Sequence, residues 1–148
     1  MKSIFNNVIK DELINRINSL TEDSQSQWGN MNVFQMVKHC RIWDEMMQGE
    51  ENLKQTLVGK IFGRIALKAV LGNDKPLRQS TPTAPILTIK EITGNFNEER
   101  ALWISSIEKY CTYHNPQFRH VFFGKMTREQ VGQMAYKHID HHLRQFNG

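Results

Sequence analysis

Apolar and polar positions alternate with the period of an α-helix along most of the chain. Apolar residues recur every three or four positions in five segments, residues 6–20, 32–48, 53–71, 96–113 and 127–146,. This spacing gathers the apolar side chains on one face of each segment, as in helices that pack around a shared core. We therefore predict an all-α fold.

Residues with helix-capping chemistry support these boundaries. A side-chain oxygen at the start of a helix accepts a hydrogen bond from a first-turn amide, and a Glu or Gln three residues later can complete a capping box. The pairs with this spacing are Asn32–Gln35, Asn95–Glu98 and Thr127–Gln130. We expect them to begin the second helix and the last two.

Residues 72–92 interrupt the helical pattern. Pro76, Pro82 and Pro85 remove amide donors and favour extended neighbours, so we expect a long connection without a helix,. Four main helices with this crossover between the second and the third predict a four-helix bundle.

The segment at 53–71 is amphipathic. Its apolar positions are Leu57, Val58, Ile61, Phe62, Ile65 and Ala69, and a basic stripe of Lys60, Arg64 and Lys68 lies opposite. We interpret the stripe as a solvated face and expect neither a membrane nor a nucleic-acid partner. Two glycines and the absence of a flanking basic cluster argue against a membrane helix, and no aromatic residues are interleaved for base stacking. The alternative, binding to either partner through the stripe, predicts strongly salt-dependent association.

Composition bounds the size and class of the protein. The 148 residues, 39% of them hydrophobic, suffice for a single domain over 1–148, and 23% charged residues exclude a disordered chain,. The net charge of +4 is modest. No apolar run is long enough to cross a bilayer, and residues 1–14 carry charges where a signal peptide is apolar,. We therefore expect a cytoplasmic protein, with Cys40 and Cys111 as reduced, buried, structural thiols.

Three histidines carry the candidate chemistry. On the last helix His138 and His142, one turn apart, share the apolar face, with Lys137, Asp140 and Arg144 opposite and expected to face water,. On the second helix His39 shares the apolar face. Burying three imidazoles without partners is costly, whereas a shared divalent ion accepts their lone pairs. We predict a metal site of His39, His138 and His142; the alternative is a set of core histidines satisfied by the protein itself.

Other polar residues receive secondary roles in this interpretation. Gln35 and Trp43 lie one turn on either side of His39 and are expected to line the site. His141 lies on the shoulder of its helix and is expected to be peripheral. His114 and His120 are interpreted as ordinary loop residues, although a loop closing the end of the bundle brings His120 within reach. Asp44 and Glu45 are placed at the edge or outer face of the helix, so no carboxylate base is predicted.

Three stretches, residues 28–40, 122–127 and 137–146, resemble the DinB-like superfamily, and more closely a branch of it whose function is undefined. The resemblance implies an up-down-down-up four-helix bundle, often dimeric, with a divalent metal on one histidine of the second helix and an HxxxH pair on the last. These positions are His39, His138 and His142. Gln145 matches a glutamine that commonly follows the last ligand. Leu143-Arg144 departs from the Arg-Gly of many members.

The function that follows is a metal-dependent enzyme. Three neutral imidazoles leave an open coordination position, as in catalytic sites. Together with the resemblance, this predicts thiol transfer or hydrolysis on a small molecule, with a low-molecular-weight thiol as one candidate. The competing class is a non-catalytic, metal-stabilised bundle in stress response or protein interaction. Zinc or nickel is expected, iron and copper are alternatives, and we expect a homodimer.

Overall fold

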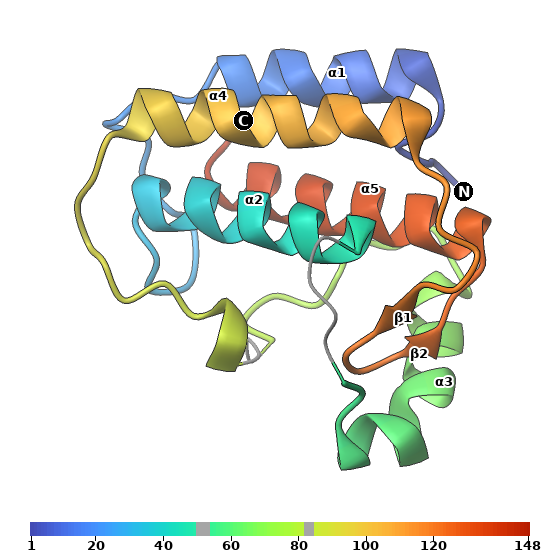
Figure 1. The fold of residues 1–148 in the computed structure, drawn as a ribbon. Helices are drawn as coiled ribbons and strands as arrows, with labels where there is room; N and C mark the ends of the chain where they lie inside the picture. Colours follow the sequence, from blue (N-terminus) through green and yellow to red (C-terminus); the bar gives the residue numbers. More distant parts are fainter. Residues whose placement is uncertain (50–53, 82–84) are drawn as a thin grey trace.

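The computed structural model describes residues 1–49, 54–81 and 85–148, and it is mainly helical (Figure 1). This confirms the predicted helical fold. No helix in the described part of the chain combines the length and apolar character that crossing a membrane requires. The α-helices are α1 (Asn7–Asn18), α2 (Val33–Gln48), α3 (Leu57–Leu71), α4 (Phe96–Glu108) and α5 (Arg128–Gln145).

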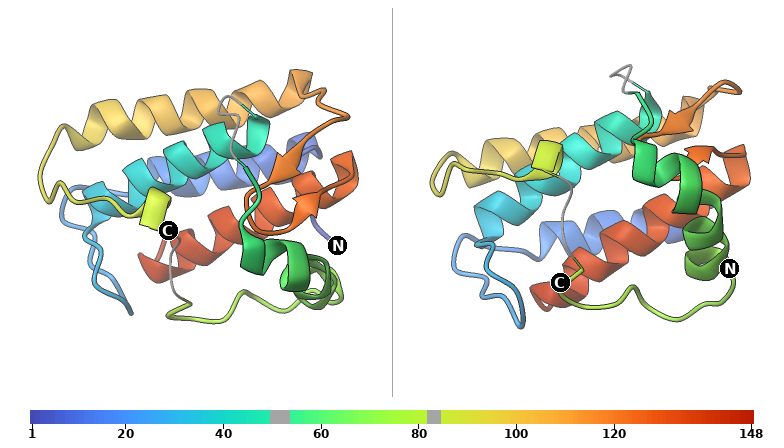
Figure 2. Two further views of the ribbon diagram at one scale, coloured as in Figure 1. Left: turned by 60° about the horizontal axis from the view of Figure 1, so that its bottom comes forward. Right: turned by 90° about the horizontal axis from the view of Figure 1, so that it is seen from below.

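Four of these helices share one core. α2 packs against both α4 and α5, and α1 also contacts both, so the four lie side by side (Figures 1 and 2). Each helix contributes side chains that are fully shielded from solvent, among them Leu13, Met36, Trp103, Ile107 and Ile139. This core positions α2 and α5, which carry the candidate site.

The helix starts follow the predicted capping pattern. Asn32 accepts a hydrogen bond from the Gln35 amide, and the Gln35 side chain accepts one from the Asn32 amide. Thr127 and Gln130 form the same reciprocal pair at the start of α5. Asn95 caps α4. The predicted helix over 96–113 is divided, because α4 ends at Glu108 and a 3-10 helix, η2 (Lys109–Thr112), continues it.

A small hairpin, absent from the sequence prediction, precedes α5. Its strands are β1 (Arg119–His120) and β2 (Gly124–Lys125), which pair antiparallel. α3 packs against this hairpin through β2, and it also contacts α5 (Figure 2). Residue 53, the predicted start of that helix, lies outside the described residues; the helix begins at Leu57 with Thr56 as its cap.

The connection before α4 carries a short 3-10 helix, η1 (Pro85–Leu87), that the sequence did not predict. Pro82 lies outside the described residues. Leu87 is buried and η1 contacts α2, so this part of the connection covers the helix that bears His39.

Several predictions of burial were wrong. Five apolar residues of α3, Leu57, Val58, Ile61, Phe62 and Ile65, are 55–77% exposed. Val8 and Leu102, apolar positions in the predicted helices over 6–20 and 96–113, are also exposed, as is Cys111. The periodicity placed these residues on shared faces, but too few neighbours cover those faces. Cys40 is buried as expected, and burial holds the pKa of its thiol well above the usual value.

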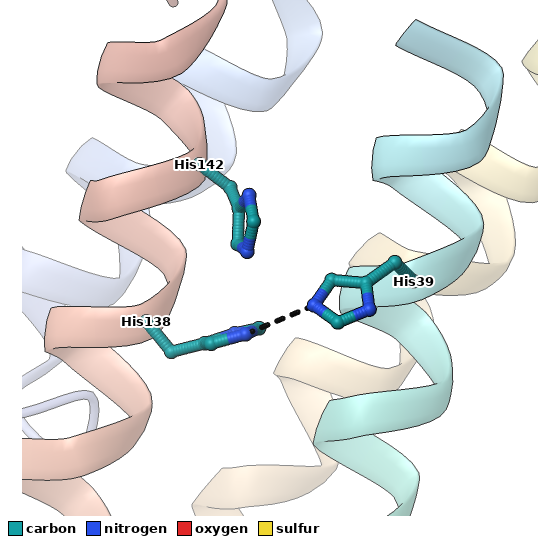
Figure 3. A group of neighbouring side chains, drawn as sticks. All are labelled: His39, His138 and His142. Atoms are coloured by element: carbon teal, nitrogen blue, oxygen red, sulfur yellow. Dashed lines mark hydrogen bonds between the residues drawn. The ribbon is translucent and has the colours of Figure 1, made fainter. Parts of the chain in front are cut away.

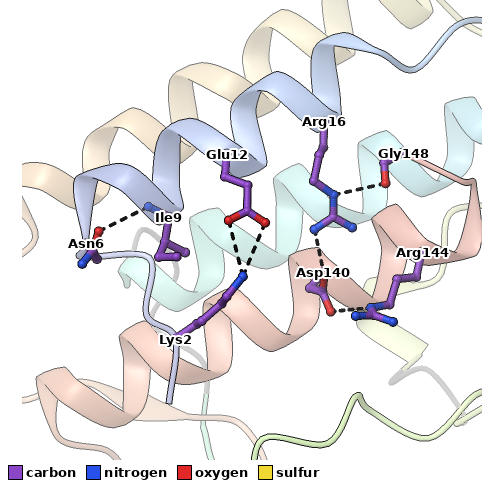
Figure 4. A network of polar contacts seen from close by, with 8 residues as sticks. All are labelled: Lys2, Asn6, Ile9, Glu12, Arg16, Asp140, Arg144 and Gly148. Atoms are coloured by element: carbon purple, nitrogen blue, oxygen red, sulfur yellow. Dashed lines mark hydrogen bonds and ion pairs between the residues drawn. The ribbon is translucent and has the colours of Figure 1, made fainter.

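The face of α5 that was expected to meet water is largely buried. Lys137 donates to the carbonyls of Asn73 and Lys75, each at 2.7 Å. Asp140 lies between Arg16 and Arg144, with an ion pair of 2.8 Å to each (Figure 4). Arg144 is exposed, as expected. For Lys137 and Asp140 the expectation was wrong, because α1 and the segment after α3 cover this part of α5 and satisfy both charges.

Candidate metal centre

The three predicted histidines meet between α2 and α5. His39 comes from α2, and His138 and His142 come from successive turns of α5 (Figure 3). The Nε2 atoms of His39 and His138 lie 3.2 Å apart, and one ring nitrogen from each histidine lies within 4.8 Å of the others. All three residues are at most 8% exposed. The group therefore has the size and burial of a site that could hold a metal ion.

The Nδ1 atoms of two rings are occupied by oxygen acceptors. Nδ1 of His39 donates to the Leu87 carbonyl at 2.9 Å, and Nδ1 of His142 donates to Oε1 of Gln145 at 2.8 Å. The Gln145 amide is held in this orientation because its Nε2 donates to the Trp28 carbonyl at 2.7 Å. A carbonyl can only accept, so the ring proton lies on Nδ1 and each Nε2 keeps a free lone pair. Metal-binding histidines are oriented in the same way.

His138 is held by stacking instead. Its ring lies parallel to Trp43, with centroids 3.9 Å apart and an angle of 12° between the planes. Its Nδ1 is buried without a hydrogen-bond partner among the described residues. Its Nε2 faces the lone pair of His39, which requires either a proton or a cation between the two nitrogens. A divalent cation fits this donor set, because it would take the place of that proton.

Burial keeps the three rings neutral. Desolvation lowers the pKa of His142 to about 3, holds the pKa of His138 well below its usual value and lowers the pKa of His39. Neighbouring imidazoles lower the first two further. At neutral pH the rings therefore present lone pairs, the form that ligates metals.

A family model for proteins of unknown function, DUF1569, matches residues 5–148. The chain belongs to the DUF1569 family. No curated protein and no solved structure matches it. The matched range includes His39, His138 and His142, so the candidate centre lies within the family domain.

The residues expected around the centre of this DUF1569 protein have distinct positions. Trp43 and Gln145 contact the ligand rings, as described above. The side-chain Nε2 of Gln35 donates to the Ile89 carbonyl, and this hydrogen bond holds the chain just after Leu87 against α2. Gln35 makes no described hydrogen bond to the histidines. His141 lies outside the ligand group and packs against Trp28, with ring centroids 5.6 Å apart. Its peripheral role stays a prediction.

His120 is not an ordinary loop residue. It lies in β1, is 7% exposed, and accepts hydrogen bonds at Nδ1 from the amides of Phe122 and Phe123. The proton of the neutral ring is therefore on Nε2, which is buried without a described partner. Burial lowers its pKa to about 4, and His120 is one of the imidazoles that lower the pKa of His138. The interpretation as a loop residue was wrong because the hairpin that folds His120 inward has no clear sequence signature.

Sequence reasoning also missed two backbone acceptors and one carboxylate. The Leu87 and Trp28 carbonyls belong to the backbone, so no side-chain pattern identifies them. Asp44 was placed at the helix edge, but it is fully buried and accepts hydrogen bonds from Trp103 Nε1 and the Tyr110 hydroxyl, both at 2.8 Å. Burial raises its pKa to about 7. Asp44 contacts α4 and η2, and it is not part of the histidine group.

Proposed function

We propose that this DUF1569 protein binds one divalent metal ion through Nε2 of His39, His138 and His142 and uses it in thiol transfer or hydrolysis. The observation that carries the proposal is the pair of hydrogen bonds from Nδ1 of His39 and His142, because they direct two free Nε2 lone pairs into the same space. Imidazole ligands suit zinc or nickel first, with iron and copper as alternatives.

The number of ligands supports catalysis over a purely structural role. Structural zinc sites commonly have four protein ligands, whereas catalytic sites have three and an open position. A divalent ion bound here would act as a Lewis acid that lowers the pKa of a coordinated thiol or water. Leu87 and Gln145 orient two rings, Trp43 fixes the third, and the Nε2–H of His120 is the candidate donor to a bound substrate.

The same proposal includes membership of the DinB-like superfamily. The mutual packing of α1, α2, α4 and α5, with α3 and a long connection between α2 and α4, supports an up-down-down-up bundle. The meeting of His39 with the HxxxH pair supports the shared metal site. A homodimer and a low-molecular-weight thiol substrate are parts of this proposal that follow from the resemblance.

The first test is elemental analysis of protein purified without added metal, chelator or acid. We expect about one divalent ion per chain, as a three-histidine site would hold. Less than about a tenth of an ion per chain, together with a melting temperature that a chelator leaves unchanged, would refute the metal site and the enzyme with it.

A second test separates catalysis from structural metal binding. The protein is loaded with Co²⁺, and its visible spectrum is recorded while a small thiol such as 2-mercaptoethanol is added. An open position predicts a new thiolate-to-cobalt band that saturates with thiol concentration. A spectrum that no added thiol or azide changes, in a protein that the metal stabilises, would instead establish the non-catalytic metal-stabilised bundle.

A further inference from the structure

The exposed apolar surface of α3 has no role in the metal site. We call Leu57, Val58, Ile61, Phe62 and Ile65 the apolar face of α3. Each of these side chains is more than half exposed, and Leu57 reaches 77%. Isolated exposed apolar residues are common, but five on one face of one helix form a patch, and such patches mark binding surfaces.

This face is free because the opposite side of α3 makes the contact with the protein. Gly59, Gly63 and Leu67 are the buried residues of the helix. A side chain at Gly59 or Gly63 would collide with the carbonyl oxygen of Phe122 in the hairpin. The two glycines that argued against a membrane helix in the sequence are therefore the packing contact, and they do not interrupt the exposed face.

The charge of α3 limits what can cover the apolar face. Lys60, Arg64 and Lys68 are exposed beside it and not opposite it as predicted, because the buried Gly59, Gly63 and Leu67 occupy the opposite side,. None of the three cations forms an ion pair with another described residue. The helix contains no Asp or Glu. On the side of α3 towards α5, one carboxylate, that of Glu129, lies among three cations, Arg64, Lys68 and Lys125. A partner of complementary chemistry is apolar and anionic.

We propose that α3 binds the protein to an anionic lipid surface. A basic amphipathic helix lies in such a surface with its apolar side chains among the acyl chains and its cations at the headgroups. α3 lies at the edge of the molecule, outside the group of four packed helices and in contact with α5 (Figures 1 and 2), where a flat surface can reach its exposed side. From the sequence we expected no membrane partner, in part because of the two glycines in this helix. In the structure both glycines lie on the buried side of α3, so they do not weaken its exposed apolar face.

Two other partners fit the same surface less well. In an antiparallel pair of α3 helices related by a two-fold axis, the basic stripe of each copy lies beside that of the other, without carboxylates between them. A nucleic acid would use Lys60, Arg64 and Lys68 but would leave the apolar face exposed, because the phosphate backbone selects cations only.

The test is co-sedimentation with vesicles of phosphatidylcholine alone and of phosphatidylcholine with roughly a third phosphatidylglycerol. We expect binding to the anionic vesicles only, weaker at about 300 mM than at about 50 mM NaCl. The double variant Ile61→Ser/Phe62→Ser and the triple variant Lys60→Gln/Arg64→Gln/Lys68→Gln should each weaken binding about tenfold or more. The matched control, Val8→Ser/Lys90→Gln, changes exposed residues away from α3 and should bind like the wild type.

A tryptophan on the apolar face of α3 allows a fluorescence test of the same proposal. When anionic vesicles are added, the tryptophan emission of Phe62→Trp should shift to the blue by more than the emission of the wild-type protein does. The proposal is overturned if no vesicle binds, if both vesicle types bind equally, or if the control loses as much binding as the α3 variants. It is also overturned if Ile61→Ser/Phe62→Ser abolishes a homodimer in sedimentation without any vesicle binding, or if DNA alone shows the salt-dependent binding.

Discussion

α5 and α3 both depart from the usual rule that polar side chains are exposed and apolar ones buried, and they depart from it in opposite ways. α5 buries His138 and His142, and it also buries Lys137 and Asp140 on its other side. α3 exposes its largest apolar side chains. Both helices have clear helical periodicity, so the difference comes from their neighbours: α1 and α2 pack against α5, whereas α3 has the hairpin and one side of α5.

A helical pattern shows which residues share a face, while the neighbouring elements determine whether that face is buried. Buried polar groups are tolerated when each has a partner. On α5, Lys137 has two carbonyls, Asp140 has two arginines, and His142 has Gln145. On this helix, Nδ1 of His138, at the candidate metal centre, is buried without a hydrogen-bond partner among the described residues.

Removing a metal ligand from α5 should have the largest effect. His138→Ala deletes one of the three proposed ligands, so we expect less than about a tenth of a metal ion per chain where the wild type retains about one. A chelator should lower the melting temperature of the wild type and leave that of the variant unchanged. His141→Ala on the same helix should behave like the wild type. Equal metal content in His138→Ala and the wild type would contradict the assignment.

Removing the buried carboxylate of Asp44, between α2 and α4, should cause the second largest effect, a loss of folding stability. Asp44→Ala leaves Trp103 Nε1 and the Tyr110 hydroxyl buried without an acceptor, and we expect a loss of about 3 kcal/mol in the free energy of unfolding. Denaturant unfolding of the metal-free protein measures it. Asp44→Asn can still accept from Trp103 Nε1 through its one amide oxygen and can donate from its NH2 group to the Tyr110 oxygen, so it should lose less.

The pH dependence of Asp44→Asn tests the same site. The pKa of Asp44 is raised to about 7, so the folded state binds its proton more tightly than the unfolded state, and this contribution to stability is lost as the pH rises towards 7,. The lowered pKa of His39 and His142 acts oppositely, because stability is lost as the pH falls below about 6.5,. From pH 7 to 5, metal-free Asp44→Asn should therefore lose more stability than the wild type. Parallel pH profiles would contradict this.

Adding one methyl group to the buried side of α3 should break its contact with the hairpin. A Cβ at Gly63 would collide with the Phe122 carbonyl, so we expect Gly63→Ala to destabilise the protein by about 1–3 kcal/mol,. Helix propensity alone predicts a gain of about 1 kcal/mol. Arg64→Ala, at the neighbouring exposed position, should change little. A more stable Gly63→Ala would show that α3 does not pack as described.

A smaller effect is expected from the residue that orients His142. Gln145→Met removes the acceptor for Nδ1 while keeping the length of the side chain, and metal affinity should fall about 10- to 100-fold. Competition with a chromophoric chelator measures this. Gln133→Met is the matched control on α5, because Gln133 donates to the exposed Glu129. An unchanged affinity in Gln145→Met would mean that the ring needs no such support.

The smallest effect is expected on the apolar face of α3. Ile61→Ser should change the free energy of unfolding by no more than about 0.5 kcal/mol, because this side chain is 69% exposed,. The same substitution at fully buried Ile107 should cost about 3 kcal/mol or more,. Thermal or denaturant unfolding of the two variants tests the comparison directly. A large loss in Ile61→Ser would indicate that a partner or a second copy covers the face in solution.

The sequence alone is enough to predict the helices and the three histidines of the candidate centre. Periodicity and capping pairs such as Thr127–Gln130 are local, because they depend on residues three or four positions apart. The HxxxH spacing placed His138 and His142 on one face for the same reason. His39 was assigned from the apolar face of its own helix and from the resemblance, and the structure brings it to the pair.

Only the tertiary structure decided what surrounds these residues. The Leu87 carbonyl reaches His39 across 48 positions of the chain, and Asp44 meets Trp103 across 59. His120 is turned inward by a hairpin of two-residue strands, too short to leave a pattern. The burial of Asp140 and the exposure of Ile61 likewise depend on distant segments. Local patterns fix which side chains share a face, and packing between remote parts of the chain decides whether that face meets protein or solvent.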